Sequence, residues 1–557
     1  MSTSSTKSGS KKAPPKNRAG QGRYSRNEPE VPVVVEQDLP EKVWRIGVLV
    51  IFLIAAVLRL YDLNLVPLHH DEGVNGNFLV RLVREGAYTY DPANYHGPTL
   101  YYFSAIIPWF TKVLFGNTVR DNYGLTTFTI RLVPVVFGLG TIWLIFLLRR
   151  RLGTVATLSA GLMLAVSPGA VYLSRYFIHE TLFVFFTLGI VVAAVWFYDE
   201  RNSAYLIPGA ACAALLFATK ETAFISVGVL IIALVATWLY MNLIGGLNSN
   251  PYSKRARTQQ GVGAVIEEMG GTTSLLFNVL FAAGVFIALY VLFYTSFFTN
   301  NKGFNDSLQT FAVWTKTGKQ AHVHPAEQYI KWLMRQESPL LFLGALGAAI
   351  AVLRPKNLLA LFCALWSFGL IAAYSLIGYK TPWLVLNFIV PLALIAGYAL
   401  QAIYEMDHRQ LRLAAVILLV AVGVAASQSV DLNFKNYDND DQKYVYVYAH
   451  TKRSILDLVN EVDKIAKQTS GNSTGITIVS PDYWPLPWYF RNYTRVGYYG
   501  RMAAASEPII IANANQKDEV ETNYGQFYQQ VSGPQPGGTF ELRPGVNLLL
   551  YTRRTGL

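Results

Sequence analysis

Long runs of apolar residues follow one another along most of this chain. Four of them, residues 46–58, 181–196, 224–239 and 384–400, contain no acidic or basic side chain. A water-soluble core rarely sustains such runs so often, whereas a helix that spans a bilayer needs about 20 mostly apolar residues. Windows of this length predict about eleven membrane spans, at residues 43–62, 125–148, 154–173, 179–198, 203–219, 222–244, 275–297, 339–353, 357–377, 383–404 and 412–430.

A twelfth apolar stretch, residues 99–115, decides the topology, because counting it as a span would reverse the side of every later loop. It is short and contains Pro108 and Lys112. If it lies in the interface, the cluster at residues 149–151 and the pair Arg354 and Lys356 face the cytoplasm, as the positive-inside rule expects. We therefore expect an interfacial helix. This choice places five loops and the C-terminal region outside the cell.

The two ends of the chain differ from its apolar middle. Residues 1–42 form a basic tail rich in Ser, Pro and Gly, which we expect to be disordered and cytoplasmic. Residues 431–557 combine a helical pattern with strand-like runs, which predicts a small extracytoplasmic α/β domain. Residues 43–430 form the multi-span membrane domain. The predicted fold is a mainly α, polytopic protein of the cell membrane.

Composition supports a membrane protein and excludes several function classes. Apolar residues make up 52% of the chain and charged residues only 15%, which argues against a soluble enzyme, a disordered protein and a secreted disulfide scaffold. The net charge of +12 comes mostly from the tail, and no folded basic domain follows it. Membrane lipids are therefore expected partners, and nucleic acid is not.

Acidic residues avoid the middle of every predicted span. Each Asp and Glu between the first and last span falls in a loop or at a span end. A transporter of ions or polar solutes usually keeps ionisable groups near the bilayer midplane. The distribution favours an enzyme that acts at the outer membrane surface over a carrier.

The first outer loop carries the densest set of reactive side chains, with His69, His70, Asp71 and Glu72 directly after the first span. Asp71 or Glu72 can act as a general base that takes a proton from an acceptor hydroxyl. Alternatively, Asp71 is the N-cap of a helix and has no chemical role. His70 is a candidate substrate ligand. The two histidines leave a divalent metal open, although they lack the spaced third ligand of most zinc sites.

Other outer loops add candidates at the same depth. Arg175, Lys220 and Lys380 are cations that can hold a donor phosphate, and Glu180 is a second candidate catalytic acid. Snorkelling or ion pairs with neighbours such as Glu221 explain the same cations without a ligand. The remaining candidate substrate-binding residues are His96, Tyr101, His179, Tyr379 and Trp383.

Two patterns in the later outer loops are also relevant. In the fourth loop, His322 and His324 can share one face of a strand, and Trp314 can join them in a lid. In the fifth loop, Pro382 starts a helix, and the free N–H groups of a helix start are typical of an anion site. We expect the fifth loop to contribute to phosphate binding.

Several of these motifs occur together in one known family. They are His70-Asp71-Glu72, Tyr95-His96-Gly97-Pro98-Thr99-Leu100-Tyr101-Tyr102, Arg131-Leu132-Val133-Pro134, Ser174-Arg175-Tyr176 with His179-Glu180, and Tyr379-Lys380-Thr381-Pro382-Trp383-Leu384. In this order along a multi-span chain, they resemble the GT-C type membrane glycosyltransferases, in the branch of the protein O-mannosyltransferases and the lipid A aminoarabinose transferase. Within this branch the chain most resembles the flippase activity-associated group of prokaryotic surface-glycan proteins.

The resemblance implies a GT-C-like membrane domain and a polyprenyl-phosphate sugar donor. The sugar would pass to an extracytoplasmic glycan, lipid or protein by an inverting single displacement. Asp71 matches the catalytic acid of the family's first loop, and Glu180 matches its second acidic position. The Trp-Trp-Asp motif of oligosaccharyltransferases is absent, which argues against en bloc transfer to asparagine. The alternative function is a non-catalytic protein of lipid-glycan transport, associated with a flippase.

Overall fold

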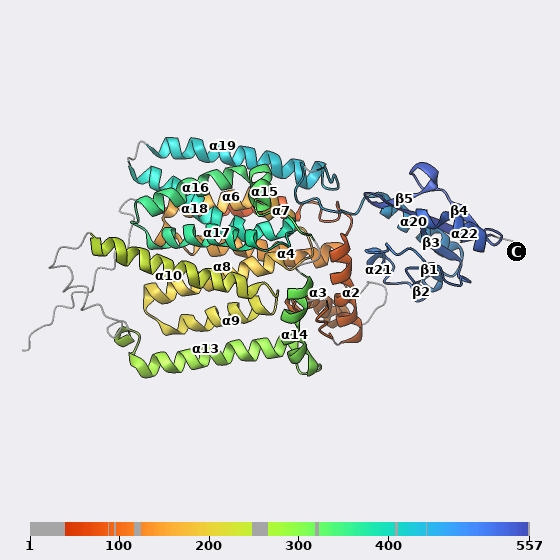
Figure 1. Ribbon diagram of the computed structural model, residues 1–557, viewed down its shortest axis with the longest axis horizontal. Coiled ribbons are helices and arrows are strands. Elements are labelled where there is room, and N and C mark those ends of the chain that lie inside the picture. The colour runs from red at the N-terminus through yellow and green to blue at the C-terminus, as the bar shows by residue number, and fades with distance from the viewer. Residues whose placement is uncertain are drawn as a thin grey trace, which may run out of the picture. The chain divides into compact units, whose positions relative to one another are not determined.

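The computed structural model describes residues 39–86, 88–93, 96–115, 124–247, 266–317, 322–406, 410–441 and 443–554. Within these ranges, eight helices are long and apolar enough to span a membrane. They are α1 (Glu41–Leu60), α4 (Thr127–Phe146), α8 (Glu180–Glu200), α10 (Ala223–Leu247), α13 (Gly271–Tyr294), α17 (Leu358–Leu376), the turn η3 (Pro382–Val385) with α18 (Leu386–Met406), and α19 (Leu411–Val430) with the turn η5 (Asp431–Lys435). Figure 1 shows these long helices running in a common direction.

Two further pairs of helices are each long and apolar enough to span a membrane when taken together. Both pairs are sharply bent, with a proline at the start of the second helix. The pairs are α6 (Thr154–Val166) with α7 (Pro168–Ser174), and α15 (Gln328–Gln336) with α16 (Ser338–Leu353). The bends measure 61° and 112°. Proline lacks an N–H and its ring clashes with the preceding turn, so it is favoured where a new helix begins. A shorter apolar helix, α9 (Leu206–Phe217), follows the turn η2 (Ser203–Tyr205).

Each of the eleven expected spans overlaps an apolar helix, but within the described residues only eight helices, or ten with the bent pairs, are long enough to cross, and α9 is shorter. The mainly α, polytopic fold is confirmed. The structure adds one feature at the segment expected at 339–353. The apolar helix α16 is directly preceded there by the amphipathic helix α15, which was not predicted from the sequence. Shorter helices follow or precede the spans. They are α2 (His70–Glu85), α3 (Thr99–Phe115), α5 (Arg149–Leu152) and α14 (Lys302–Thr317). The N-terminal tail up to residue 38 and the Trp314 side chain lie outside the described part of the chain.

The C-terminal region folds around one mixed sheet. The strand order is β2-β1-β3-β6-β4, and β5 also pairs with β6. β1 is parallel to β2 and β3, whereas β6 is antiparallel to β3, β4 and β5. The strands are β1 (Ile476–Ile478), β2 (Val496–Tyr498), β3 (Ile509–Asn513), β4 (Tyr528–Val531), β5 (Phe540–Arg543) and β6 (Val546–Arg553), and the helices are α20 (Ser454–Gln468), α21 (Leu486–Tyr489) and α22 (Lys517–Tyr524).

Alternation along β3 explains why helices cover both faces of this sheet. Ile509 and Ile511 pack in one apolar cluster with Leu458 of α20. Ile510, between them, packs in a second cluster with Val520 of α22. Successive side chains of a strand point to opposite faces, so a run of three isoleucines needs an apolar cover on each side. The α/β character expected for this region is confirmed.

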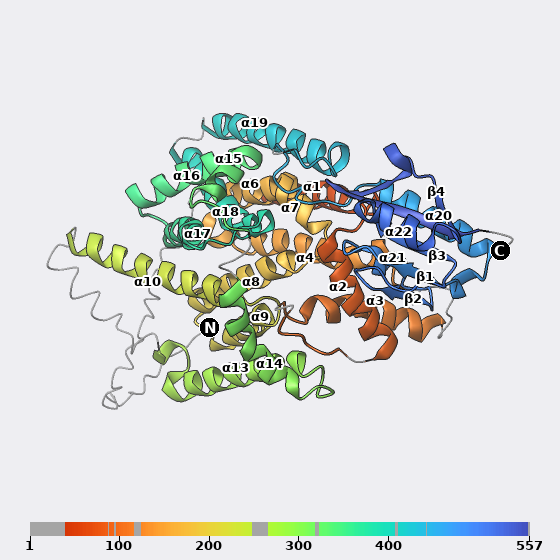
Figure 2. The same cartoon turned by 45° about the vertical axis from the view of Figure 1, so that its right-hand side comes forward.

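The C-terminal region also contacts α2, the helix that follows the first span. In Figures 1 and 2, α2 lies next to α21. A Cβ at Gly76 would lie 2.6 Å from the Trp488 ring, so this close approach requires glycine. Tyr489 accepts a hydrogen bond at its hydroxyl from the backbone N–H of Leu68, at 3.0 Å. The start of α2 is therefore held by the C-terminal region as well as by the spans.

Candidate functional site

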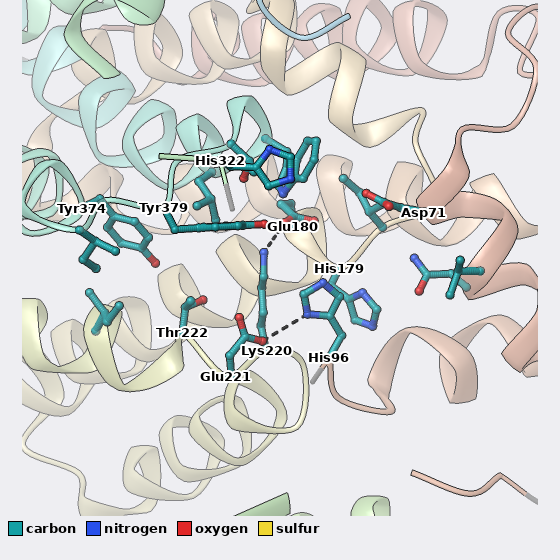
Figure 3. Close-up of a pocket in the computed structure, with 18 of the residues that line it drawn as sticks. Asp71, His96, His179, Glu180, Lys220, Glu221, Thr222, His322, Tyr374 and Tyr379 are labelled. Carbon is teal, nitrogen blue, oxygen red and sulfur yellow. Dashed lines mark hydrogen bonds and ion pairs between the residues drawn. The ribbon is translucent and has the colours of Figure 1, made fainter. Parts of the chain in front are cut away.

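A polar cavity of about 290 Å³ lies where the loops at one end of the spans meet. Residues from all five of the loops assigned to the outer side line it, including Asp71, Glu180, Lys220, His322 and Tyr379. Figure 3 shows these five side chains around the cavity. Residues that are hundreds of positions apart in the sequence are thereby brought together.

The shared cavity also bears on the expected place of α3. Asp71 follows the first span, and Glu180 begins α8, with only α4 and the bent pair α6–α7 between them as spans. Two crossings return the chain to the same side, whereas a third crossing by α3 would separate these carboxylates. They line the same cavity, as expected if α4 and the bent pair each cross once and α3 lies in the interface.

The first turn of α2 is fixed by a histidine cap. His69 is the N-cap: its Nδ1 accepts a hydrogen bond from the backbone N–H of Asp71 at 3.1 Å, and Glu72 accepts one from the backbone N–H of His69 at 3.0 Å. This reciprocal pattern is a capping box, with histidine in place of serine or threonine. The alternative that Asp71 caps the helix is therefore wrong, and Gly73 lies inside the helix.

Asp71 projects from this first turn toward the cavity with 41% of its side chain exposed. It lies 3.8 Å from His69 Nδ1, but that nitrogen accepts a hydrogen bond and so carries no proton. Among the described residues, no hydrogen bond ends on the Asp71 carboxylate. Its lone pairs are available to a proton from outside the protein.

Glu72, the neighbouring candidate, is completely buried and does not line the cavity. Arg131 of α4 donates to both of its oxygens, from Nε at 2.8 Å and from Nη2 at 2.6 Å. The backbone N–H of Phe177 donates a further bond at 2.8 Å. Glu72 thus joins α2, α4 and the loop before α8, and its oxygens are occupied.

An ion pair and a hydrogen-bonded histidine–carboxylate pair line the site. Lys220 pairs with Glu180, and His96 Nδ1 lies 3.2 Å from an oxygen of Glu221. Burial opposes the charge of Lys220, but the negative charges of Glu180 and Glu221 raise its pKa overall, so it is a cation at neutral pH. In Figure 3, Asp71 lies to one side of these pairs.

His179 brings an unpaired nitrogen to the site. Its Nε2 lies 3.0 Å from the carbonyl oxygen of Gly97 and must donate to it, which leaves Nδ1 as an acceptor. Burial holds the pKa of His179 well below its usual value, so the ring stays neutral. Nδ1 and the hydroxyl of Thr381 are both buried without a hydrogen-bond partner among the described residues. Buried polar atoms of this kind point to a polar ligand.

Other predicted residues lie away from the cavity wall. The Arg175 guanidinium donates to backbone carbonyls at the end of α1, including that of Tyr61 at 2.6 Å. Lys380 donates to the carbonyls of Ile377 and His324. The Tyr101 hydroxyl donates to Asn75 at 2.9 Å, behind the wall. None of the three predicted residues lines the cavity, and Lys220 is the only predicted phosphate ligand that does.

The remaining predicted substrate residues, His70, Tyr379 and Trp383, line the cavity. Burial lowers the pKa of His70, although the Asp71 charge opposes the shift. Tyr448, which the sequence did not indicate, lies behind these residues. Its hydroxyl is 2.9 Å from His322 Nδ1, and its ring centroid is 6.1 Å from that of Trp383.

Tyr448 also reaches the start of α2, because its backbone carbonyl lies 3.1 Å from His69 Nε2. Glu221, which the sequence treated only as a neutralising neighbour, also lines the cavity. The charge of Glu221 beside Lys220 was a usable signal, whereas nothing in the sequence around Tyr448 distinguished it from other tyrosines.

Within the described residues, no group of three His, Cys, Asp or Glu side chains is arranged to hold a metal ion.

Comparisons with known proteins agree on the architecture. The family model for dolichyl-phosphate-mannose-protein mannosyltransferase matches residues 105–244. ArnT from Cupriavidus metallidurans, solved with undecaprenyl phosphate, superposes with a TM-score of 0.58 and 12% identity, over 92% of this chain and 97% of that chain. The oligosaccharyltransferase AglB from Archaeoglobus fulgidus, solved with an inhibitory peptide and a dolichol-phosphate, gives a TM-score of 0.52 and 13% identity, over 90% and 74%. No curated protein matches the sequence.

Proposed function

We propose that this chain, which has the fold of the GT-C type membrane glycosyltransferases, transfers a sugar from a polyprenyl-phosphate donor to an extracytoplasmic acceptor. The resemblance inferred from the sequence motifs is confirmed at the level of the fold. The donor, the acceptor and the orientation of the chain, with its N-terminus in the cytoplasm, are part of the proposal.

The observation that carries this proposal is a second cavity beside the first. It measures about 410 Å³ and lies between α10, α16 and α17. Its lining is apolar throughout and includes Val229, Ala236, Val352, Phe368 and Ala373. A partly open apolar groove among apolar helices suits a hydrocarbon chain and offers no hydrogen-bond partner to a polar solute.

The two cavities share two helices. On α10, Ile225 lines the polar cavity, and Val229, one turn further, lines the apolar one. On α17, Tyr374 lines the polar cavity and its neighbour Ala373 the apolar one. A ligand with a charged sugar-phosphate head and a long isoprenoid tail would fill both. ArnT was solved with undecaprenyl phosphate and AglB with a dolichol-phosphate, which are lipid phosphates of this chemistry.

The proposed reaction is a single displacement that inverts the anomeric carbon. The oxygen of an acceptor hydroxyl attacks that carbon while Asp71 takes the hydroxyl proton. The bond between the carbon and the phosphate oxygen breaks, and the lipid phosphate leaves with the electron pair. Lys220 faces the negative charge that develops on it, and Glu180 holds the ammonium group in place.

The direct test uses purified protein in vesicles with a polyprenyl phosphate that carries a radiolabelled sugar. We expect free polyprenyl phosphate to appear only when an acceptor is present, with the label moved to the acceptor. Movement of intact labelled lipid across the vesicle, with no release of polyprenyl phosphate, would support the transport alternative and reject the transferase.

The apolar cavity gives a prediction about donor length. Replacing Ala236 with phenylalanine fills part of this cavity, so we expect the KM for a long-chain donor to rise about tenfold, the equivalent of roughly two buried methylene groups. The KM for a donor with a short isoprenyl chain should change little. Val235→Phe is the matched control, because Val235 is exposed on the same helix and does not line the cavity. Equal effects on both donor lengths would contradict the assignment.

A further inference from the structure

A row of aromatic rings leads from the polar cavity onto the C-terminal region. The rings belong to His70, Trp484, Tyr483 and Tyr498, and we call them the aromatic path. Successive ring centroids are 6.1, 5.7 and 5.2 Å apart. All four side chains are partly exposed. The path begins at the residue next to Asp71 and ends on β2, at one edge of the sheet.

The path is fixed to the helix that carries Asp71. A Cβ at Gly73 would lie 2.6 Å from the Cβ of Pro485 and 3.3 Å from the Trp484 ring, so glycine is needed for this approach. On the other side, Tyr483 and Tyr498 pack against the apolar core of the C-terminal region. The rings therefore form a rigid surface rather than a set of mobile side chains.

A charged pair lies next to the path. Arg543 of β5 donates to the Asp482 carboxylate, and both side chains remain partly exposed. Both charges act on the pKa of His70, in addition to its burial and the Asp71 charge, so they lie near the cavity end of the path. Carboxylate and guanidinium groups bind hydroxyl groups readily.

We propose that the aromatic path is the binding site of a carbohydrate acceptor, whose sugar rings stack along it and present a hydroxyl group to Asp71. This inference rests on the proposed function and names the class of acceptor. The C–H groups on a pyranose face carry partial positive charge, which the negative face of an aromatic ring attracts. The hydroxyl groups around the pyranose ring then reach the Asp482–Arg543 pair.

The chemistry of the path favours a glycan over a lipid acceptor. The rings carry polar N–H and O–H groups and lie beside an ion pair, whereas the apolar space that suits a hydrocarbon lies between α10 and α17. Successive rings of the path can each stack on one sugar of a chain of linked sugars. The path is longer than a single sugar, so it suits an acceptor that consists of several sugars.

The test measures binding to the full-length protein in detergent micelles, by saturation-transfer NMR. The probes are a β-linked glucose hexasaccharide and an α-linked mannose hexasaccharide. We expect saturable binding of at least one probe, weakened about tenfold by Trp484→Ala. Tyr498→Leu, which retains apolar bulk at the other end of the path, should weaken it similarly. Phe527→Ala is the matched control, since Phe527 is 49% exposed beside β4 at the opposite edge of the sheet.

The outcomes separate this inference from the proposed function. Asp71→Asn should bind the hexasaccharide as well as the wild type does, because stacking needs no turnover. If neither probe binds, if Phe527→Ala weakens binding as much as Trp484→Ala, or if a Ser- and Thr-rich peptide occupies the path instead, the inference falls even when transferase activity is found. Binding that depends on Trp484 in a protein without transferase activity would support the path and reject the enzyme.

Discussion

Asp71→Asn is expected to reduce the rate of sugar transfer by roughly 10³-fold, within the range that a general base contributes. Asparagine keeps the shape of the side chain and the capping box, whose hydrogen bonds involve the Asp71 backbone and not its carboxylate. It cannot accept the proton of an acceptor hydroxyl. The initial rate of polyprenyl phosphate release measures the effect, and KM for the donor should stay nearly constant.

The assignment of the base depends on which carboxylates are free. Glu72 is paired with Arg131, Glu180 with Lys220, and Glu221 with His96. A carboxylate held by a cation, as Glu72 and Glu180 are, is a weaker proton acceptor, and a hydrogen bond with the His96 ring occupies one oxygen of Glu221. Glu85→Gln is the control for Asp71→Asn, because Glu85 is an exposed carboxylate at the far end of the same helix. Turnover retained by Asp71→Asn, or lost equally in Glu85→Gln, would reject the base assignment.

Glu72→Gln is expected to destabilise the folded protein by about 3–5 kcal/mol, although it removes only one charge. The change leaves the Arg131 guanidinium buried, with no negative charge to balance it. Thermal unfolding of the purified protein should show a lower midpoint, and the yield of folded protein should fall with it.

The double variant Glu72→Gln with Arg131→Met distinguishes a structural role of Glu72 from a chemical one. Removing the stranded charge should recover part of the lost stability, since a buried ion pair replaced by uncharged groups is often tolerated. Activity per folded molecule should stay close to that of the wild type. A double variant that is stable but inactive would return Glu72 to the candidate catalytic residues.

The spans and the identity of the cavity loops could be predicted from the sequence, because both depend on local patterns. Apolar runs mark the helices, and the sites of lone charges at span ends mark the loops. Asp71, Glu180 and Lys220 were found in this way and line one cavity. The sequence also predicted an interfacial α3, from its short length, from Pro108 and Lys112, and from the distribution of cations.

The roles of individual cations could not be predicted, because a guanidinium or ammonium group binds a backbone carbonyl as readily as a phosphate. Arg175 and Lys380 looked like phosphate ligands in loops, yet backbone carbonyl oxygens, some of them distant in the sequence, occupy them. The N-cap of α2 also could not be predicted from the local sequence. A histidine cap has no strong sequence signature, so Asp71 was the more obvious N-cap.

The contacts of Tyr448 link the last span to the chemistry of the first loop. This residue lies in the connection between α19 and the sheet, and its hydroxyl and carbonyl reach His322 and His69. The C-terminal region is therefore not an interchangeable module that evolution could replace to acquire a new acceptor. A chimaera would retain a working centre only if the junction were placed after Tyr448, and acceptor range would diverge through the surface beyond it.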